Sequence, residues 1–87
     1  MTIDKNAIIL DVRTSEEFEG QHVPGAINIP VDQIPYRMDE IKKMPKPIIA
    51  YCRSGARSGM AVNIMKQNGI TEAMNGGGIG DMLLSLK

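Results

Sequence analysis

Residues 48–58 have the sequence IIAYCRSGARS, and this stretch decides the fold because it combines a strand, a loop and the start of a helix. Its first four residues are apolar without alternation, which is typical of a strand buried on both faces in a parallel sheet. We expect the strand to end at Cys52 and residues 53–57 to form a polar loop that contains Gly55. A helical pattern then continues to Asn68.

The predicted helix has an apolar face and a defined C-terminal end. Ala61, Ile64 and Met65 have the spacing that places side chains on one side of a helix. Gly69 fits the left-handed position after the last turn, and Ile70 is expected to contact Met65 as in a Schellman motif. These features make this helix the best-defined one in the sequence.

Two further strands are expected N-terminal to the strand, loop and helix of residues 48–68. Residues 7–10 form a short apolar run that closes on Asp-Val-Arg at 11–13, which indicates a second buried strand. Turn residues follow at 23–25, and residues 26–29 then alternate like another strand that Pro30 stops. Both of these predicted strands are therefore short, and the turn residues at 23–25 lie between them.

Short helices are predicted after these strands. Thr14 and Glu17 form a Thr-x-x-Glu capping box for a brief helix that Gly20 ends. Glu16 and Glu17 are accordingly interpreted as first-turn carboxylates and not as an acid/base pair. Residues 31–44 have apolar side chains at helical spacing, but a proline inside the segment requires a helix that starts there or a kinked helix.

The C-terminal part completes an alternating pattern of strands and helices. Residues 73–75 are expected to add a short strand, the three glycines at 76–78 a tight turn, and residues 81–86 a helix. The whole pattern predicts an α/β fold with a central, mostly parallel sheet and helices on both faces. At 87 residues, the chain is expected to form a single domain over residues 1–87.

Composition excludes several classes of site. Ten basic residues balance ten acidic ones without long runs of one sign, which argues against nucleic acid or a membrane surface as a partner. Cys52 is the only cysteine and His22 the only histidine, so an internal disulfide and a thiolate-rich zinc site are excluded. No metal site and no cofactor are expected, and the chemistry rests on a lone thiol.

Cys52 occupies a position that activates a thiol. At a strand-to-helix junction, unpaired backbone N–H groups and the positive end of the helix dipole favour the thiolate. Arg53 and Arg57 add positive charge that further favours the thiolate and can hold an anion. The alternative is a structural connection in which the arginines are solvated and the buried cysteine is inert. The Cys-Arg-Ser-Gly-Ala-Arg context favours the reactive interpretation.

Several segments resemble the signature segments of rhodanese domains, in the order found in that family and over residues 8–82. They are Asp-Val-Arg at 11–13, Glu-Phe at 17–18, Gly-Gln-His at 20–22, Gly-Ala-x-Asn-Ile-Pro at 25–30 and Tyr-Cys-Arg-Ser-Gly-x-Arg-Ser at 51–58. Residues 75–79 resemble the family's Gly-Gly turn, where a tryptophan commonly follows and Met82 stands here.

This resemblance implies a thiosulfate sulfurtransferase. In rhodaneses, the cysteine that matches Cys52 attacks the outer sulfur of thiosulfate or a similar donor, releases sulfite and holds a persulfide. A thiol or cyanide acceptor, or a thiol-carrying protein, then removes the sulfur. Arg57 would also bind the donor, and Arg53 would attract donor anions at the rim. The loop amides would stabilise the persulfide anion, namely those of Ser54, Gly55, Ala56 and Arg57.

Two alternatives remain open beside the enzyme. The first is a non-enzymatic sulfur-relay or regulatory module that receives persulfide from a partner protein. The second is a phosphatase or arsenate reductase, because the family also includes phosphatases with a cysteine-to-arginine loop one residue longer. Four residues separate Cys52 from Arg57, which favours sulfur over phosphorus.

Three other polar residues are expected to have structural roles. Asp11 and Arg13 lie two positions apart at a strand end, so they are expected to support the site through a salt bridge. His22 precedes a Pro-Gly turn, and stabilisation of that turn is favoured over a role as a base.

The N-terminal region determines the expected compartment. The start MTIDKN lacks the features of a signal peptide, so the chain as written is expected to be cytoplasmic. Only a short segment precedes the first strand, and in this the chain resembles the short phage shock protein E type of rhodanese. That type is exported, so a mature form without its signal peptide would be periplasmic.

Overall fold

The computed structural model describes residues 6–85, which are organised around a parallel sheet. Neighbouring strands follow the order β2-β1-β3-β4, and each pairing is parallel, as the sequence predicted. β3 therefore lies inside the sheet, between β1 and β4. The bounds of the strands are Ile8–Asp11 for β1, Ile27–Asn28 for β2, Ile48–Cys52 for β3 and Ala73–Gly78 for β4.

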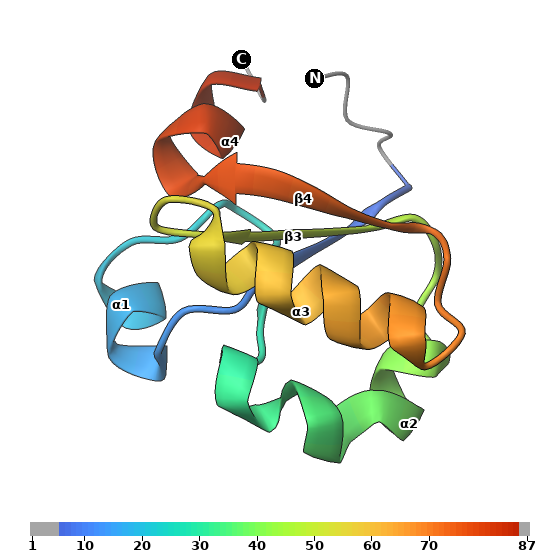
Figure 1. The fold of residues 1–87 in the computed structure, drawn as a ribbon. Coiled ribbons are helices and arrows are strands. Elements are labelled where there is room, and N and C mark those ends of the chain that lie inside the picture. The colour runs from blue at the N-terminus through green and yellow to red at the C-terminus, as the bar shows by residue number, and fades with distance from the viewer. Residues whose placement is uncertain (1–5, 86–87) are drawn as a thin grey trace.

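Helices cover both faces of the sheet, which confirms the predicted architecture (Figure 1). Helix α3 lies on one face with the helical pair η1 and α2, and α4 lies on the opposite face. Helix α1 lies at the end of the sheet where β3 leads into the loop before α3. The bounds are Ser15–Gly20 for α1, Val31–Arg37 for the 3₁₀ helix η1, Met38–Lys42 for α2, Ala56–Gln67 for α3 and Ile79–Ser85 for α4.

Every residue of β3 is buried, and its side chains alternate between two apolar clusters. Ile48, Ala50 and Cys52 belong to the larger cluster, which includes residues of α3. Ile49 and Tyr51 belong to a smaller cluster on the other face. The uninterrupted apolar run arises because both faces of this strand are covered, and the run positions Cys52 at the edge of the core.

Two predicted helix ends are confirmed. Thr14 caps α1, because its side chain accepts from the Glu17 amide while the Glu17 carboxylate accepts from the Thr14 amide. After α3, Gly69 has a φ of +91°, and the Ile70 amide donates to the Met65 carbonyl at 3.0 Å. These local motifs begin and end helices where the sequence predicted them.

The predicted tight turn at residues 76–78 is wrong, because these glycines belong to β4. Cys52 is paired with Gly78 after an irregularity in the register between Ala50 and Cys52. This irregularity accommodates Gly77, whose φ of +86° is unusual for a strand. The following helix begins at residue 79 and not at 81, and the Asp81 carboxylate accepts from the Gly78 amide at 3.3 Å.

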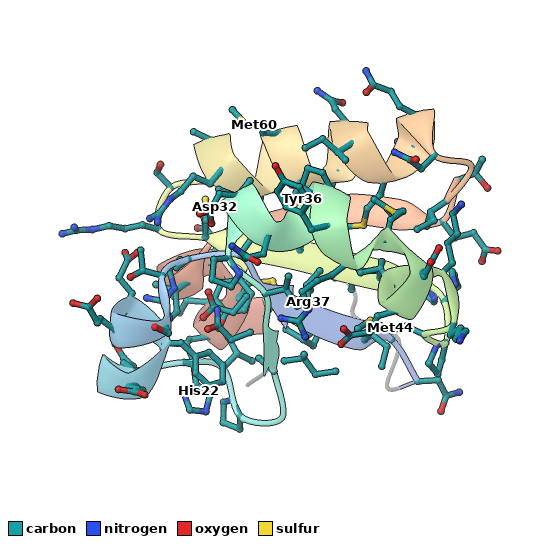
Figure 2. All side chains as sticks on the ribbon, turned by 90° about the horizontal axis from the view of Figure 1, so that it is seen from below. His22, Asp32, Tyr36, Arg37, Met44 and Met60 are labelled. Atoms are coloured by element: carbon teal, nitrogen blue, oxygen red, sulfur yellow. The ribbon has the colours of Figure 1, made fainter. Side chains whose placement is uncertain are left out.

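The segment between β2 and β3 is divided into two short helices. Pro35 lies inside η1, and α2 follows without a gap. Ile34, Met38 and Ile41 are buried in the larger cluster, so the predicted apolar face is confirmed. Tyr36 points outward from η1 and is 84% exposed (Figure 2). Met60 lies on α3, which packs against η1, and is 58% exposed.

Candidate active site

Cys52 ends β3 with its side chain directed at the loop that begins α3. Its sulfur accepts from the Gly55 amide at 3.0 Å, from the Ser58 amide at 3.4 Å and from the Ser58 hydroxyl at 3.5 Å. The residue is only 1% exposed. The thiol is therefore buried among hydrogen-bond donors and not among apolar groups alone.

These donors change the acidity of the thiol. Burial raises the pKa of Cys52, but this effect is outweighed by hydrogen bonds from the Ser58 hydroxyl and amide and from the amides of Ser54 and Gly55. The net result lowers the pKa of the thiol from 9.0 to about 7. A large fraction of thiolate is therefore present near neutral pH, as a nucleophile requires.

Gly55 gives the loop its shape. Its φ of +102° lies in the left-handed region, which side chains other than glycine rarely adopt. This conformation turns its amide toward Cys52 while its carbonyl accepts from the Gly59 amide at 3.0 Å and from the Asn75 side-chain amide at 3.0 Å. Gly55 is thereby the N-cap residue of α3.

The two arginines of the loop have different surroundings. Arg53 is exposed at the rim. Arg57 is partly exposed and forms an ion pair with Glu17 of α1, with Nη1 2.7 Å from Oε1 and Nη2 3.1 Å from Oε2. This pair raises the pKa of Arg57 and lowers that of Glu17 to about 2. The sequence predicted the capping role of Glu17 at the start of α1 but not this ion pair.

Ser58 and Asn75 are part of the site although they were absent from the predicted set. The Ser58 hydroxyl lies 2.7 Å from Asn75 Oδ1, which also accepts from the Gly77 amide at 2.9 Å. Asn75 thus connects β4 to the loop around Cys52. The signal that could have identified it is its position near the carboxyl end of a strand beside β3, where parallel strands bring their functional residues together.

The glycines of β4 allow the loop to approach the sheet closely. A methyl group built on Gly78 would lie 2.5 Å from the Arg53 carbonyl oxygen, closer than side-chain carbons approach backbone oxygens. A methyl group on Gly55 would lie 3.4 Å from Gly77 Cα. Loop and strand are therefore in contact through backbone atoms, and this contact holds the amides near the sulfur.

Asp11 and Arg13 form the predicted salt bridge, with Arg13 Nη2 2.7 Å from Asp11 Oδ2. The Tyr51 hydroxyl donates to the same Asp11 oxygen at 2.7 Å and accepts from the Val23 amide at 3.0 Å. Arg13 also donates to the Gln21 carbonyl. No described hydrogen bond joins this network to residues 53–57. Tyr51 precedes Cys52 in β3, and the charge of Arg13 acts on Arg57 by lowering the pKa of that guanidinium.

Burial and the contacts with Asp11 change the pKa values of Tyr51 and Arg13. Desolvation raises the pKa of Tyr51 to about 12, and the hydrogen bond to Asp11 and its charge act in the same direction. The hydrogen bond to Asp11 raises the pKa of Arg13. Tyr51 is therefore a neutral hydrogen-bonding group throughout the neutral pH range.

His22 lies beside α1 and contacts Phe18 (Figure 2). The two rings are stacked with their centroids 3.8 Å apart, and His22 Nδ1 lies 2.7 Å from the Phe18 carbonyl oxygen. These contacts attach the histidine to α1 through Phe18.

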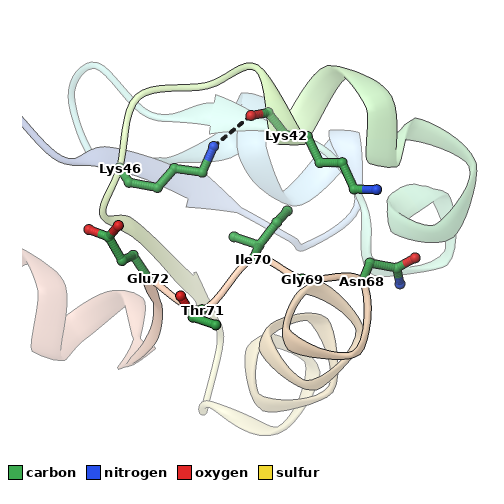
Figure 3. Close-up of a pocket in the computed structure, with 7 residues that line it drawn as sticks. All are labelled: Lys42, Lys46, Asn68, Gly69, Ile70, Thr71 and Glu72. Carbon is green, nitrogen blue, oxygen red and sulfur yellow. Dashed lines mark hydrogen bonds between the residues drawn. The ribbon is translucent and has the colours of Figure 1, made fainter.

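A surface hollow of about 250 Å³ lies away from Cys52 (Figure 3). Lys46 and Glu72 border it just before β3 and β4 begin, whereas Cys52 lies at the end of β3. The Lys46 ammonium donates to the carbonyls of Lys42 and Met44 at 2.7 Å each, so it forms hydrogen bonds with the protein's own backbone. This hollow contributes no group to the thiol site.

Two other features are absent from residues 6–85. Within this range, no three histidine, cysteine, aspartate or glutamate residues gather in a way that could hold a metal ion. None of the helices described there has the length and apolar character that crossing a membrane requires.

A buried thiol at the carboxyl end of a parallel strand, surrounded by amides of a Cys-x4-Arg loop, defines a rhodanese-type α/β domain. Residues 1–79 match the family described as Rhodanese-like domain. The chain therefore belongs to the rhodanese family.

Relatives of this chain include proteins with sulfur-transfer names. Thiosulfate sulfurtransferase PspE of Escherichia coli is 34% identical over 76 residues, which are 86% of this chain and 73% of PspE. The uncharacterized protein YqhL of Bacillus subtilis is 44% identical over 71 residues, 82% of this chain and 56% of YqhL. The putative sulfur carrier protein YrkF of B. subtilis is 39% identical, over 83% of this chain and 38% of YrkF.

This chain thus spans little more than half of YqhL and less than half of YrkF. Among solved structures, a rhodanese with anions from E. coli has a TM-score of 0.78 and 34% identity over 86% of this chain and 89% of that one. The human single-domain sulfurtransferase TSTD1 has a TM-score of 0.74 and 27% identity over 91% and 82%. The named sulfurtransferase and sulfur-carrier relatives support sulfur transfer in general.

Proposed function

We propose that this chain transfers sulfane sulfur from thiosulfate or a similar donor to a thiol or cyanide acceptor through a persulfide on Cys52. The observation that carries the proposal is the set of donors around the sulfur, with the Gly55 amide at 3.0 Å and the Ser58 amide at 3.4 Å. These donors stabilise negative charge on sulfur, which is the charge that both the thiolate and the persulfide carry.

The reaction takes place in two displacements at sulfur. The Cys52 thiolate attacks the outer sulfur of thiosulfate, a new S–S bond forms, and the bond to the inner sulfur breaks as sulfite leaves with the electron pair. An acceptor thiolate or cyanide then attacks the outer sulfur of the persulfide. The S–S bond to the protein breaks, and the Cys52 thiolate is regenerated without an external oxidant or reductant.

Unused donors of the loop are suited to the outer sulfur. The amides of Ala56 and Arg57 form the first turn of α3, and neither has a hydrogen-bond partner among the described residues. An anionic sulfur attached to Cys52 would satisfy these amides. Arg57 would bind the oxygen atoms of the donor, and the exposed Arg53 would attract anions to the rim.

The size of the site favours sulfur over phosphorus. Four residues lie between Cys52 and Arg57, and the Cys52 side chain is only 1% exposed. A donor that ends in a single sulfur atom reaches such a site more readily than a phosphoryl group, whose equatorial oxygens need a wider ring of donors. Hydrolysis of phosphate esters by the protein would contradict this preference.

Intact mass spectrometry tests the proposal directly. The protein is incubated with thiosulfate, freed of excess donor and measured before and after addition of a reducing agent. We expect a mass increase of one sulfur atom, reversed by the reductant and absent from the Cys52→Ser variant. Failure of the unmodified protein to gain sulfur, or retention of the gain in Cys52→Ser, would overturn the proposal.

A sulfur-relay function is the second candidate because one relative is named a putative sulfur carrier protein. In this version, a partner protein that carries persulfide would supply the sulfur, and a thiol-carrying protein would accept it. Steady-state rates distinguish the two versions. An enzyme shows sustained turnover with thiosulfate and cyanide, whereas a relay module loads with sulfur but turns over poorly with these small molecules.

A further inference from the structure

Glu17 has more contacts than the cap of a helix requires. Its carboxylate accepts from the Thr14 amide at 3.1 Å, which is part of the capping box of α1, and from the Thr14 hydroxyl of the same cap at 3.2 Å. The same carboxylate accepts two hydrogen bonds from the Arg57 guanidinium, at 2.7 and 3.1 Å. Capping explains only the first pair of contacts, so the second pair calls for a separate explanation.

The ion pair joins two elements that meet at the Cys52 end of the sheet. Arg57 and Glu17 are 40 positions apart, and α1 lies beside the loop that begins α3 (Figure 1). Two parallel N–H···O bonds determine the plane of a guanidinium as well as its position. The side chains are 33% and 28% exposed, so a donor from solvent can reach the pair.

Arg57 is influenced by two anions. The hydrogen bond to Glu17 is the largest influence that raises its pKa, and the charge of Cys52 acts in the same direction. A guanidinium has five N–H groups, and the two bonds to Glu17 leave three without a partner among the described residues. Arg57 can therefore bind an anionic donor while it remains attached to Glu17, but with part of its charge already offset.

We infer that Glu17 is a positioning residue for sulfur transfer, which holds the Arg57 guanidinium at the mouth of the Cys52 loop and limits the positive charge that an anionic donor meets. The inference rests on the proposed function, because it assigns Glu17 a part in the same site. Its consequence is selectivity, since a partly neutralised guanidinium gains less from a second negative charge on the donor than a free one does.

The Glu17→Gln variant separates the two roles of this side chain. Glutamine also completes a capping box, so α1 keeps its cap, whereas the charged pair with Arg57 is lost. Two donors are compared, thiosulfate as a dianion and methanethiosulfonate as a monoanion. We expect the KM for thiosulfate to fall by roughly two- to fivefold relative to that for methanethiosulfonate, and kcat to fall because the guanidinium is less well oriented.

Two further variants test whether Glu17 acts through Arg57. In the Arg57→Met background, Glu17→Gln should change neither the KM ratio nor kcat. Thr14→Ala removes the capping hydroxyl but leaves the ion pair, so it should lower the unfolding midpoint without a change in the KM ratio. Equal effects of Glu17→Gln in both backgrounds, or the same kinetic effects from Thr14→Ala, would overturn the inference.

A readout without any donor keeps this test independent of the proposed function. We expect Glu17→Gln to lower the pKa of the Cys52 thiol, measured by ultraviolet titration, and to have no such effect in the Arg57→Met background. If the unmodified protein accepts sulfur from neither donor, the proposed function fails, while the titration still decides the role of Glu17. No shift, or equal shifts in both backgrounds, would contradict that role.

Discussion

Ser58 reaches back to Cys52, with its amide nitrogen 3.4 Å and its hydroxyl oxygen 3.5 Å from the sulfur. The same hydroxyl lies 2.7 Å from Asn75 Oδ1. A hydroxyl has one proton, so it donates to one of these acceptors at a time. Because a thiolate accepts hydrogen bonds strongly, we expect the proton to turn from Asn75 to the sulfur when the thiol ionises.

Replacement of Ser58 by alanine should therefore raise the pKa of the Cys52 thiol from about 7 toward its ordinary value of 9.0. A hydrogen bond to a charged group contributes about 1.5–3 kcal/mol, which corresponds to a rise of about one to two pH units. Ultraviolet titration of the thiolate measures this shift. Ser54→Ala is the matched control, because Ser54 contributes through its backbone amide and its side chain has no described bond to the sulfur.

The lowered thiol pKa also predicts how reactivity depends on pH. Alkylation of Cys52 by iodoacetamide should accelerate as the pH rises and level off above about pH 7, since the thiolate is the nucleophile. Ser58→Ala should move this profile to higher pH. A profile centred near 9.0, as for an unperturbed thiol, would contradict the assigned environment.

The free energy of unfolding should also depend on the ionisation of the Cys52 thiol. The folded pKa is lower than the unfolded one, so the contribution of the thiolate is fully present above pH 9.0 and is lost as the pH falls through about 7. The difference in unfolding free energy between the protein and Cys52→Ser should thus grow between these values, by an amount on the order of 2–3 kcal/mol. Urea denaturation at both ends of this range measures it, and a pH-independent difference would refute the prediction.

Close packing at Gly78 predicts that alanine is not tolerated there. The added methyl group would lie 2.5 Å from the Arg53 carbonyl oxygen, so the loop must move outward and take its amides away from Cys52. We expect at least a tenfold loss of sulfur-transfer activity, because loss of transition-state donors typically costs one or more powers of ten. Gly80→Ala is the control, since among the described residues no atom outside its chain neighbours and its own helix backbone lies within 4 Å of the new methyl group, and alanine favours a helix.

The buried Tyr51 hydroxyl predicts a loss of stability when it is removed. Tyr51→Phe leaves the Val23 amide without its acceptor and Asp11 without one donor, at a cost of about 1–3 kcal/mol. Tyr36→Phe should have little effect because Tyr36 is 84% exposed. Urea denaturation provides the comparison, and equal stabilities of the two variants would contradict the role of the network.

The ion pair of Glu17 predicts sensitivity to acid. Its pKa is lowered from 4.5 to about 2, first by the hydrogen bond from Arg57 and then by the Thr14 amide. The stabilisation is therefore present above pH 4.5 and is lost as the pH falls toward 2. The stability difference between the protein and Glu17→Gln should shrink over this range, and a difference that stays constant would argue against the pairing.

The sequence alone was sufficient to predict those parts of the site that depend on neighbouring residues. The apolar run of β3, the position of Cys52 at its end and the Thr14–Glu17 capping box could all be predicted, because each depends on neighbouring residues and on the period of one strand or helix. The left-handed Gly69 after α3 follows from the same kind of local pattern.

The remaining contacts depend on which strands are neighbours and on their register, which no local pattern contains. Because β4 pairs with β3, Asn75 lies within hydrogen-bond distance of Ser58. The same pairing includes the glycines at 76–78 in the strand, although the sequence predicted a turn there. The packing of α1 beside the loop gives Arg57 its partner 40 positions away. Sequence thus determined which thiol is available for chemistry, while tertiary structure decided which donors and charges surround it, because hydrogen bonds and ion pairs depend on distances in space and not along the chain.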